Sequence, residues 1–183
     1  KIQFVDTGVW SSKALKEVKI QGLNVEVIAS SKESNYDRIP ENINFDDNAD
    51  YAYITSNNTI FGTQYKNYPS TKAPLVVDAS SDIFSYPVDW TKVDMMFAGA
   101  QKNAGPSGVT IVIIKKSLLE RVSESVPTML RYKIHAAENS LYNTPPTFGI
   151  YLLGLTLQWI KRQGGIKAIE ANNEKKAKLL YDE

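Results

Sequence analysis

The chain has 183 residues, and its 21 lysines and arginines nearly balance its 20 aspartates and glutamates. The net charge of +1 indicates no basic surface for nucleic acid or for an anionic membrane. The sequence contains no cysteine, which excludes disulfides, cysteine nucleophiles and thiolate metal sites. The single histidine, His135, cannot form a histidine zinc cluster, and we predict that it is a surface or packing residue.

Hydropathy and the chain ends bear on the location and extent of the protein. No apolar run is long enough to span a bilayer, and the N-terminus lacks the regions of a signal peptide, so we expect a cytoplasmic protein. The chain begins with KIQFVDTG, without an initiator methionine and within a predicted strand, and it stops at KAKLLYDE within a helical pattern. We therefore expect it to be a piece of a longer protein.

Six apolar segments rich in β-branched and aromatic residues predict strands at 2–8, 23–30, 50–56, 74–80, 93–99 and 108–114. Helical patterns lie between and after them: a capped helix from Ser11 or Ser12 to Gly22, a short one at 115–122, and longer ones at 147–165 and 165–183. The nearly continuous apolar strands predict an α/β fold with a mostly parallel sheet flanked by helices.

Two groups of side chains in the second half have ordinary structural interpretations. One is an apolar stripe at helical spacing, which we expect to be helix core: Tyr151, Leu152, Leu155, Trp159 and Ile160. The other is the pair Arg131 and Lys133, which we interpret as surface charge rather than as substrate ligands.

Polar residues follow three of the predicted strands where each strand ends. Residues 57–59 follow the third strand, Asp78 ends the apolar run of the fourth, and Gln101 and Lys102 follow the fifth. In parallel sheets, ligands gather at the carboxyl ends of strands. Taken alone, Lys102 is a solvated turn residue or a half-buried reactive amine, and Asp78 is a turn cap or a functional carboxylate. A pyridoxal phosphate enzyme needs such a lysine and such a carboxylate together.

Several segments make a more specific prediction. AGAQKNAGPSGVTIVI, with VVDASS before it and YNTPPTF after it, resembles the phosphoserine aminotransferase family, whose members are fold-type I, class V pyridoxal phosphate enzymes. TGVWSSKALKEVK and SNNTIFG match the same family in the same order, so the resemblance covers essentially the whole chain. It implies transfer of an amino group between glutamate and 3-phosphohydroxypyruvate in serine biosynthesis, and it leaves a role in pyridoxine biosynthesis open.

The resemblance implies roles for particular residues. Lys102 would form the Schiff base with the cofactor and move the proton between the substrate α-carbon and the cofactor. Asp78 would pair with the pyridinium nitrogen. Trp10 would stack on the ring, the alternative being a buried core tryptophan. The small residues beside Lys102 would leave clearance for that ring.

Four further residues complete the implied cofactor site. Thr59 would bind near the phenolic oxygen, and Gln101 would bind the phosphate. Asn143 and Thr144 would reach the phosphate of the cofactor in the neighbouring subunit, which implies a homodimer with shared active sites. From the residues alone, NTPPT is a helix entry with Thr144 as the cap and the prolines in the first turn.

The family pattern also predicts what this chain lacks. Its glycine-rich phosphate turn would precede residue 1, and a smaller C-terminal domain would follow residue 183. Residues 1–183 would then form a partial cofactor-binding large domain, and this piece alone would be inactive. Two other interpretations remain open: another class V enzyme, of the alanine-glyoxylate transaminase or cysteine desulfurase type, and a non-catalytic α/β binding module.

Overall fold

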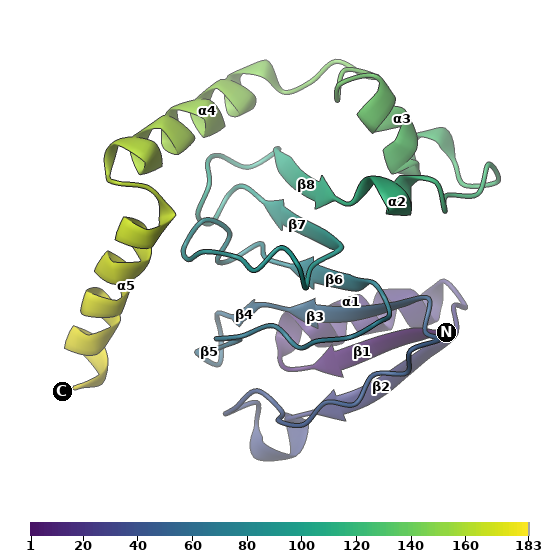
Figure 1. Cartoon of the computed structure of the whole chain (residues 1–183), viewed down its shortest axis with the longest axis horizontal. Helices are drawn as coiled ribbons and strands as arrows, with labels where there is room; N and C mark the ends of the chain where they lie inside the picture. Colours follow the sequence, from purple (N-terminus) through teal and green to yellow (C-terminus); the bar gives the residue numbers. More distant parts are fainter. Residues whose placement is uncertain (183) are drawn as a thin grey trace.

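Six strands form the central sheet of the computed structural model, which describes residues 1–182 (Figure 1). They lie in the order β2-β1-β3-β6-β7-β8, and every neighbouring pair is parallel except β7 and β8. Their bounds are β1 Ile2–Asp6, β2 Val25–Ser30, β3 Tyr51–Thr55, β6 Leu75–Asp78, β7 Met95–Gly99 and β8 Thr110–Ile114. The six strands and the mostly parallel sheet predicted from the sequence are confirmed.

The burial of the strands follows their position in the sheet. All five residues of β1 are buried, whereas the edge strands β2 and β8 have no buried residue. Successive side chains of the inner strands point to opposite faces. Phe4 and Tyr53 stack on the face that α1 covers, with ring centroids 4.3 Å apart, and Ile54 packs on the other face. The apolar strand patterns therefore reflect a sheet buried on both sides.

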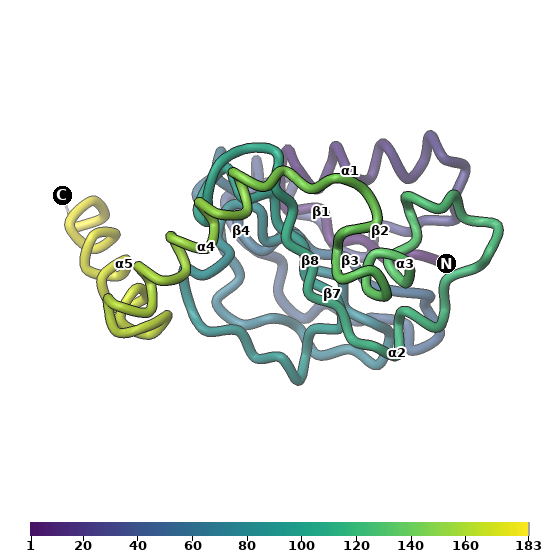
Figure 2. The backbone as a smooth tube through the Cα atoms, turned by 90° about the horizontal axis from the view of Figure 1, so that it is seen from above, coloured from purple at the N-terminus to yellow at the C-terminus, as the bar shows by residue number. Residues whose placement is uncertain are grey.

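Helices cover the two faces unequally. Apolar side chains of α1 (Val9–Ile20) pack on one face, but loop residues such as Tyr65, Tyr68 and Ile83 cover much of the other. The remaining helices are α2 Lys116–Leu119, α3 Tyr132–Ala137, α4 Thr147–Arg162 and α5 Ile166–Tyr181, with short 3-10 turns η1 Lys32–Ser34 and η2 Thr128–Leu130. Seen from above, α4 runs over the molecule and α5 extends away from it (Figure 2). Across residues 1–182, no helix combines the length and apolar character needed to cross a membrane.

The first predicted helix begins earlier than its serines suggested. It starts at Val9 because the Ser11 hydroxyl acts from inside the first turn, where it accepts hydrogen bonds from the N–H groups of Thr7 and Gly8, both at 2.9 Å. Its C-terminal end is close to the prediction: the helix ends at Ile20, and Gly22 adopts a φ of 69° that suits glycine.

The sequence patterns did not predict the shortest elements. The hairpin of β4 (Asn57–Asn58) and β5 (Thr63–Gln64) and the helix α3 are too short to show a hydrophobic period. The segment predicted at 115–122 is a helix of only four residues, α2. Helix α4 begins at Thr147, so Thr144 is not its cap and both prolines precede the helix.

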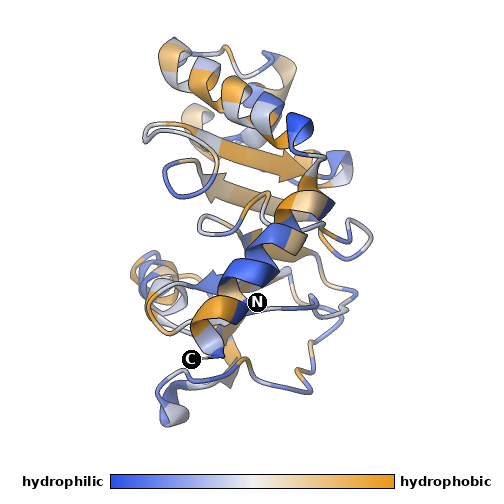
Figure 3. Ribbon diagram, turned by 90° about the vertical axis from the view of Figure 1, so that its left-hand side faces the viewer, coloured by the Kyte–Doolittle hydropathy of each residue, from blue (hydrophilic) through white to orange (hydrophobic). Residues whose placement is uncertain are grey.

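The apolar stripe of α4 is not helix core within this chain, and that prediction was wrong. Only Ile160 is buried, while Tyr151 is 60% exposed and Trp159 is 51% exposed. Hydrophobic segments recur along the ribbon of α4 (Figure 3). The helix approaches the turn after β7 at Leu153, which lies near Gly105, and at Gly149, where a Cβ would lie 2.8 Å from Val109. Its period of apolar residues therefore marks a surface that this chain does not cover.

Candidate active site

The strands that follow β1 along the chain lie on opposite sides of it. Several of the predicted site residues lie near this point of the sheet. From β1 the chain continues through α1 to β2 on one side, whereas β3 lies on the other side of β1. Open α/β sheets bind ligands at the carboxyl ends of strands beside such a point. A cavity of about 200 Å³ lies at these strand ends, lined by Trp10, Thr55, Asn57, Asp78, Ser80, Ser81, Gln101 and Lys102.

Lys102 lies in a tight turn after β7. The turn is closed by the Ala104 N–H, which donates to the Ala100 carbonyl at 3.0 Å, and by the Ala100 N–H, which donates to Val109 at 2.9 Å. The Lys102 side chain is exposed rather than half-buried, and its Nζ lies 5.0 Å from the centre of the Trp10 ring. An amine in this position reaches into the cavity from its open side.

The small residues around Lys102 have a different role from the one that the sequence suggested. Ala100 and Ala104 are completely buried in the core beneath the turn. A Cβ on Gly105 would lie 3.5 Å from the Cα of Leu153 in α4. The two alanines are therefore core residues, and at Gly105 helix α4 lies at ordinary contact distance from the turn.

Trp10 forms an open wall of the cavity. It is 40% exposed, which rules out the core-tryptophan interpretation, and it lies in the first turn of α1. The buried carboxylate of Asp6 holds that turn by accepting hydrogen bonds from Ser11 at 2.8 Å and Ser12 at 2.7 Å. Lys13 also lies over the Trp10 ring, with its Nζ 4.7 Å from the ring centre. The indole thus stands on a fixed helix start and presents its ring to cations.

Asp78 ends β6 with its carboxylate at the cavity. Its Oδ1 accepts the Ser80 N–H at 2.9 Å, so the cap interpretation is correct for one oxygen. Its Oδ2 accepts a longer bond of 3.4 Å from the Tyr53 hydroxyl. Burial, followed by the charge of Asp78, raises the pKa of Tyr53, so the phenol stays protonated and donates. The second oxygen is therefore only weakly bound within the chain and can accept a proton donor in the cavity.

The lining also includes residues that the sequence reasoning did not single out. Thr55 is buried, and its hydroxyl has no hydrogen-bond partner within residues 1–182. Ser80 accepts the Gly99 N–H at 3.2 Å. A buried hydroxyl without a partner is costly unless a ligand satisfies it. An aromatic wall, a carboxylate, an amine and spare hydroxyl and amide groups suit a charged heteroaromatic ring such as pyridoxal phosphate.

Three predicted site residues lie away from this cavity. Thr59 is exposed and lines a neighbouring depression together with Asn58. Asn143 and Thr144 are exposed in the segment before α4. Their roles toward a cofactor stay predictions. His135 lies on α3, as a packing residue would, with its Nε2 2.9 Å from the Met129 carbonyl. Within the described residues, no group of three or more His, Cys, Asp or Glu side chains suits a metal ion.

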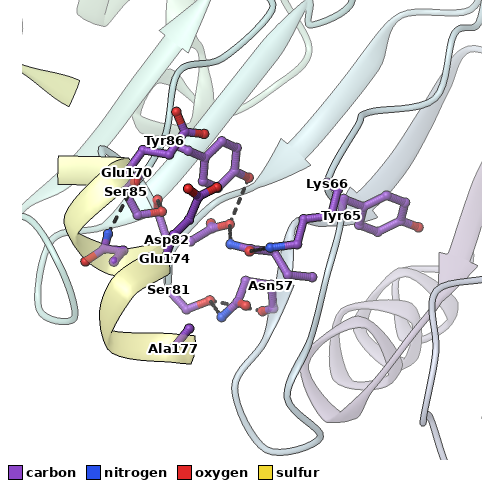
Figure 4. A pocket seen from close by; sticks show the side chains of 12 residues that line it. Asn57, Tyr65, Lys66, Ser81, Asp82, Ser85, Tyr86, Glu170, Glu174 and Ala177 are labelled. Atoms are coloured by element: carbon purple, nitrogen blue, oxygen red, sulfur yellow. Dashed lines mark hydrogen bonds between the residues drawn. The ribbon is translucent and has the colours of Figure 1, made fainter. Parts of the chain in front are cut away.

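A second cavity, of about 320 Å³, adjoins the first and shares Asn57 and Ser81 with it (Figure 4). At its base lies Asp82, which is 5% exposed and accepts hydrogen bonds from Ser56 at 2.5 Å, Tyr86 at 2.9 Å and Gln64 at 3.2 Å. Burial raises the pKa of the Asp82 carboxyl above its ordinary value of 3.8, and these hydrogen bonds oppose the rise. Nothing in the sequence marked this carboxylate.

A comparison with known protein families shows which family the chain belongs to. The model of the aminotransferase class-V family matches residues 1–183. The chain belongs to the aminotransferase class-V family. The observed sheet, mostly parallel with the antiparallel strand β8 at its edge, has the fold of a solved phosphoserine aminotransferase structure described below.

Individual relatives within the class-V family carry a more specific name. A phosphoserine aminotransferase of Lysinibacillus sphaericus is 56% identical over 185 residues, which is all of this chain and 51% of the relative. The structure of phosphoserine aminotransferase from Bacillus circulans subsp. alkalophilus is 49% identical with a TM-score of 0.95, over 99% of this chain and 51% of that one. The structure of PLP-bound phosphoserine aminotransferase from Trichomonas vaginalis is 38% identical with a TM-score of 0.92, over 99% and 55%. This chain therefore spans about half the length of its relatives.

Proposed function

We propose that this chain is the cofactor-binding part of a phosphoserine aminotransferase that uses pyridoxal phosphate. The observation that carries the proposal is the shared cavity of Lys102, Asp78 and Trp10, which come from three different strand ends. The names and identities of the relatives support the same activity: transfer of an amino group between glutamate and 3-phosphohydroxypyruvate.

Four residues of the cavity have a task in the proposed reaction. Bound pyridoxal phosphate supplies an electron-withdrawing ring and an aldehyde carbon that reacts with amines. Lys102, which lines the cavity, would hold the cofactor through that carbon and would carry a proton to and from the substrate α-carbon. Asp78 would keep the ring nitrogen protonated, since its Oδ2 accepts only a long bond from Tyr53. Trp10 would hold the ring by stacking, and Gln101 would bind the phosphate.

The shared site of a homodimer belongs to the same proposal. Asn143 and Thr144 are exposed and free to reach a neighbouring subunit. The exposed apolar side chains of α4, among them Phe148, Tyr151 and Trp159, supply a surface that a second subunit would bury. We further propose that residues 1–183 are part of a longer chain, whose remaining half contributes substrate ligands, and that the protein is cytoplasmic.

The test uses the full-length protein that this proposal implies. Addition of pyridoxal phosphate is expected to give a visible absorption band, and phosphoserine with 2-oxoglutarate is expected to be the preferred substrate pair. A panel of alanine with glyoxylate, cysteine, and the phosphorylated hydroxy-amino acid of pyridoxine synthesis tests the other class-V activities. Absence of a visible band would leave only a non-catalytic binding module. Preference for another amino donor would assign a different class-V reaction.

A further inference from the structure

We propose that Ser56 and Asp82 are positioning residues that fix the orientation of Asp78 toward the cofactor ring. Neither residue lines the Lys102 cavity, so each would act through Asp78. The inference rests on the proposed function, because it needs a ring nitrogen that Asp78 faces.

Ser56 holds the backbone of Asp78 at two points. The Ser56 N–H donates to the Asp78 carbonyl at 2.9 Å, and the Ser56 hydroxyl lies 3.0 Å from the same oxygen. The first contact continues the parallel pairing of β3 and β6, but the second is a side-chain bond that the sheet does not require. The peptide plane that follows Asp78 is therefore fixed by a buried hydroxyl as well as by the sheet.

Asp82 in turn fixes the Ser56 hydroxyl. That hydroxyl has one proton and two acceptors, the Asp78 carbonyl and the Asp82 carboxylate at 2.5 Å. Asp82 is held from the other side by Tyr86, whose hydroxyl lies 2.8 Å from that of Tyr68. Polar contacts therefore run from Tyr68 through Tyr86, Asp82 and Ser56 to the backbone of Asp78, with the one Ser56 proton shared between its two acceptors.

The groups that bind Asp82 favour a role in positioning Asp78 over a role in stability alone. No ion pair among residues 1–182 includes Asp82, so its carboxylate is held by hydroxyl and amide groups alone. A buried carboxylate without a cation is expensive compared with an apolar side chain of similar size. The network also joins the ends of β3 and β6. A second link between these strand ends is the hydrogen bond between Asn57 and Ser81 at 3.0 Å, and both of these residues line the Lys102 cavity.

The test is the pH titration of the visible band of the full-length holoenzyme. If Asp78 stabilises the proton on the ring nitrogen less well, the ring withdraws fewer electrons from the Lys102 nitrogen. That nitrogen then becomes more basic, and the pH midpoint of the band titration rises. We expect Ser56→Ala and Asp82→Asn to raise the midpoint by about half a pH unit or more. The kcat should fall about 10-fold with a smaller change in KM, and Ser56→Thr, which keeps the hydroxyl, should recover toward the wild type.

Ser85→Ala is the matched control. The Ser85 hydroxyl donates to the main-chain carbonyl of Asp82 at 2.6 Å, so its loss weakens the same loop without touching either carboxylate. It should lower thermal stability but leave the midpoint unchanged. Tyr86→Phe, which removes one donor from Asp82, should give a smaller shift in the same direction and serves if Asp82→Asn does not fold.

The outcomes separate the two proposals. No visible band in the wild type overturns the proposed function and this inference with it. A normal band in the wild type, with unchanged midpoints in the folded Ser56 and Asp82 variants, overturns the positioning role alone. An equal shift in Ser85→Ala does so as well, because general loosening of the loop would then explain the effect.

Discussion

The carboxyl edge of the sheet and the C-terminal helices are held in contrasting ways. At the edge, buried Asp6, Ser56 and Asp82 tie together segments up to 30 residues apart in the sequence through side-chain hydrogen bonds. Helix α5 has no buried residue, and a long bond of 3.3 Å joins its Asn173 side chain to the Ser85 carbonyl in the loop after β6. Side chains of this chain therefore fix the carboxyl edge of the sheet, whereas the apolar side chains of the last two helices stay largely exposed.

The largest expected effect is at the carboxyl edge. Under the proposed function, Lys102→Ala removes the amine that would bond to the cofactor and move the proton, so transamination by the full-length protein should fall at least about 1,000-fold. The visible band should change as well. Lys16→Ala, on the exposed side of α1, is the control and should keep both the band and the activity. Substantial activity in Lys102→Ala would remove the lysine from the mechanism.

The next prediction compares glycines from the two regions. A Cβ on Gly8 would lie 2.8 Å from the Asn58 side-chain oxygen, which accepts a bond from Thr7 at 3.2 Å. Gly8→Ala should therefore lower the free energy of unfolding by about 1–3 kcal/mol, as overpacking does. Gly154→Ala in α4 meets nothing within 4 Å and should raise it by about 0.5–1 kcal/mol, through helix propensity. Chemical denaturation measures both, and equal effects would contradict the contrast between the regions.

A third prediction concerns the pH dependence that Asp82 gives to the edge. Because burial raises its pKa in the folded state above 3.8, its contribution to stability is fully present below that pH and is lost as the pH rises through the raised value. Asn does not titrate. The stability of the wild type relative to Asp82→Asn should therefore decline from about pH 4 toward neutrality, by about 1.4 kcal/mol for each unit of pKa difference. Denaturation at a series of pH values checks this, and a difference that grows with pH would indicate a lowered pKa instead.

The smallest expected effect is on the exposed helix. Phe148 is 72% exposed, so Phe148→Ala should change the unfolding free energy of the subunit by less than about 0.5 kcal/mol. Ile160→Ala, on the same helix but buried, should cost about 2–4 kcal/mol. If a second subunit covers α4, Phe148→Ala should also weaken dimerisation in sedimentation experiments. A large loss of stability in a monomeric sample would show that this chain itself covers the helix.

The sequence by itself determined the strands, the type of fold and the main chemical groups. Apolar β-branched runs are local signals, and they located all six strands of the sheet. Lys102 and Asp78 were recognisable because both follow such runs, and the parallel order of the strands then brings their ends to one edge. The family segments added Trp10 and Gln101, which also line the cavity.

Only the tertiary structure decided which polar groups support that edge and which apolar groups stay exposed. The Ser56 and Asp82 side chains are 26 residues apart and meet because of the register of β3 with β6, which no local pattern encodes. Ala100 and Ala104 look like clearance around a lysine in the sequence, yet they are core residues in the fold. The apolar stripe of α4 has the period of a buried helix. This period shows which side of the helix is apolar, but it does not show whether this chain or another one covers that side.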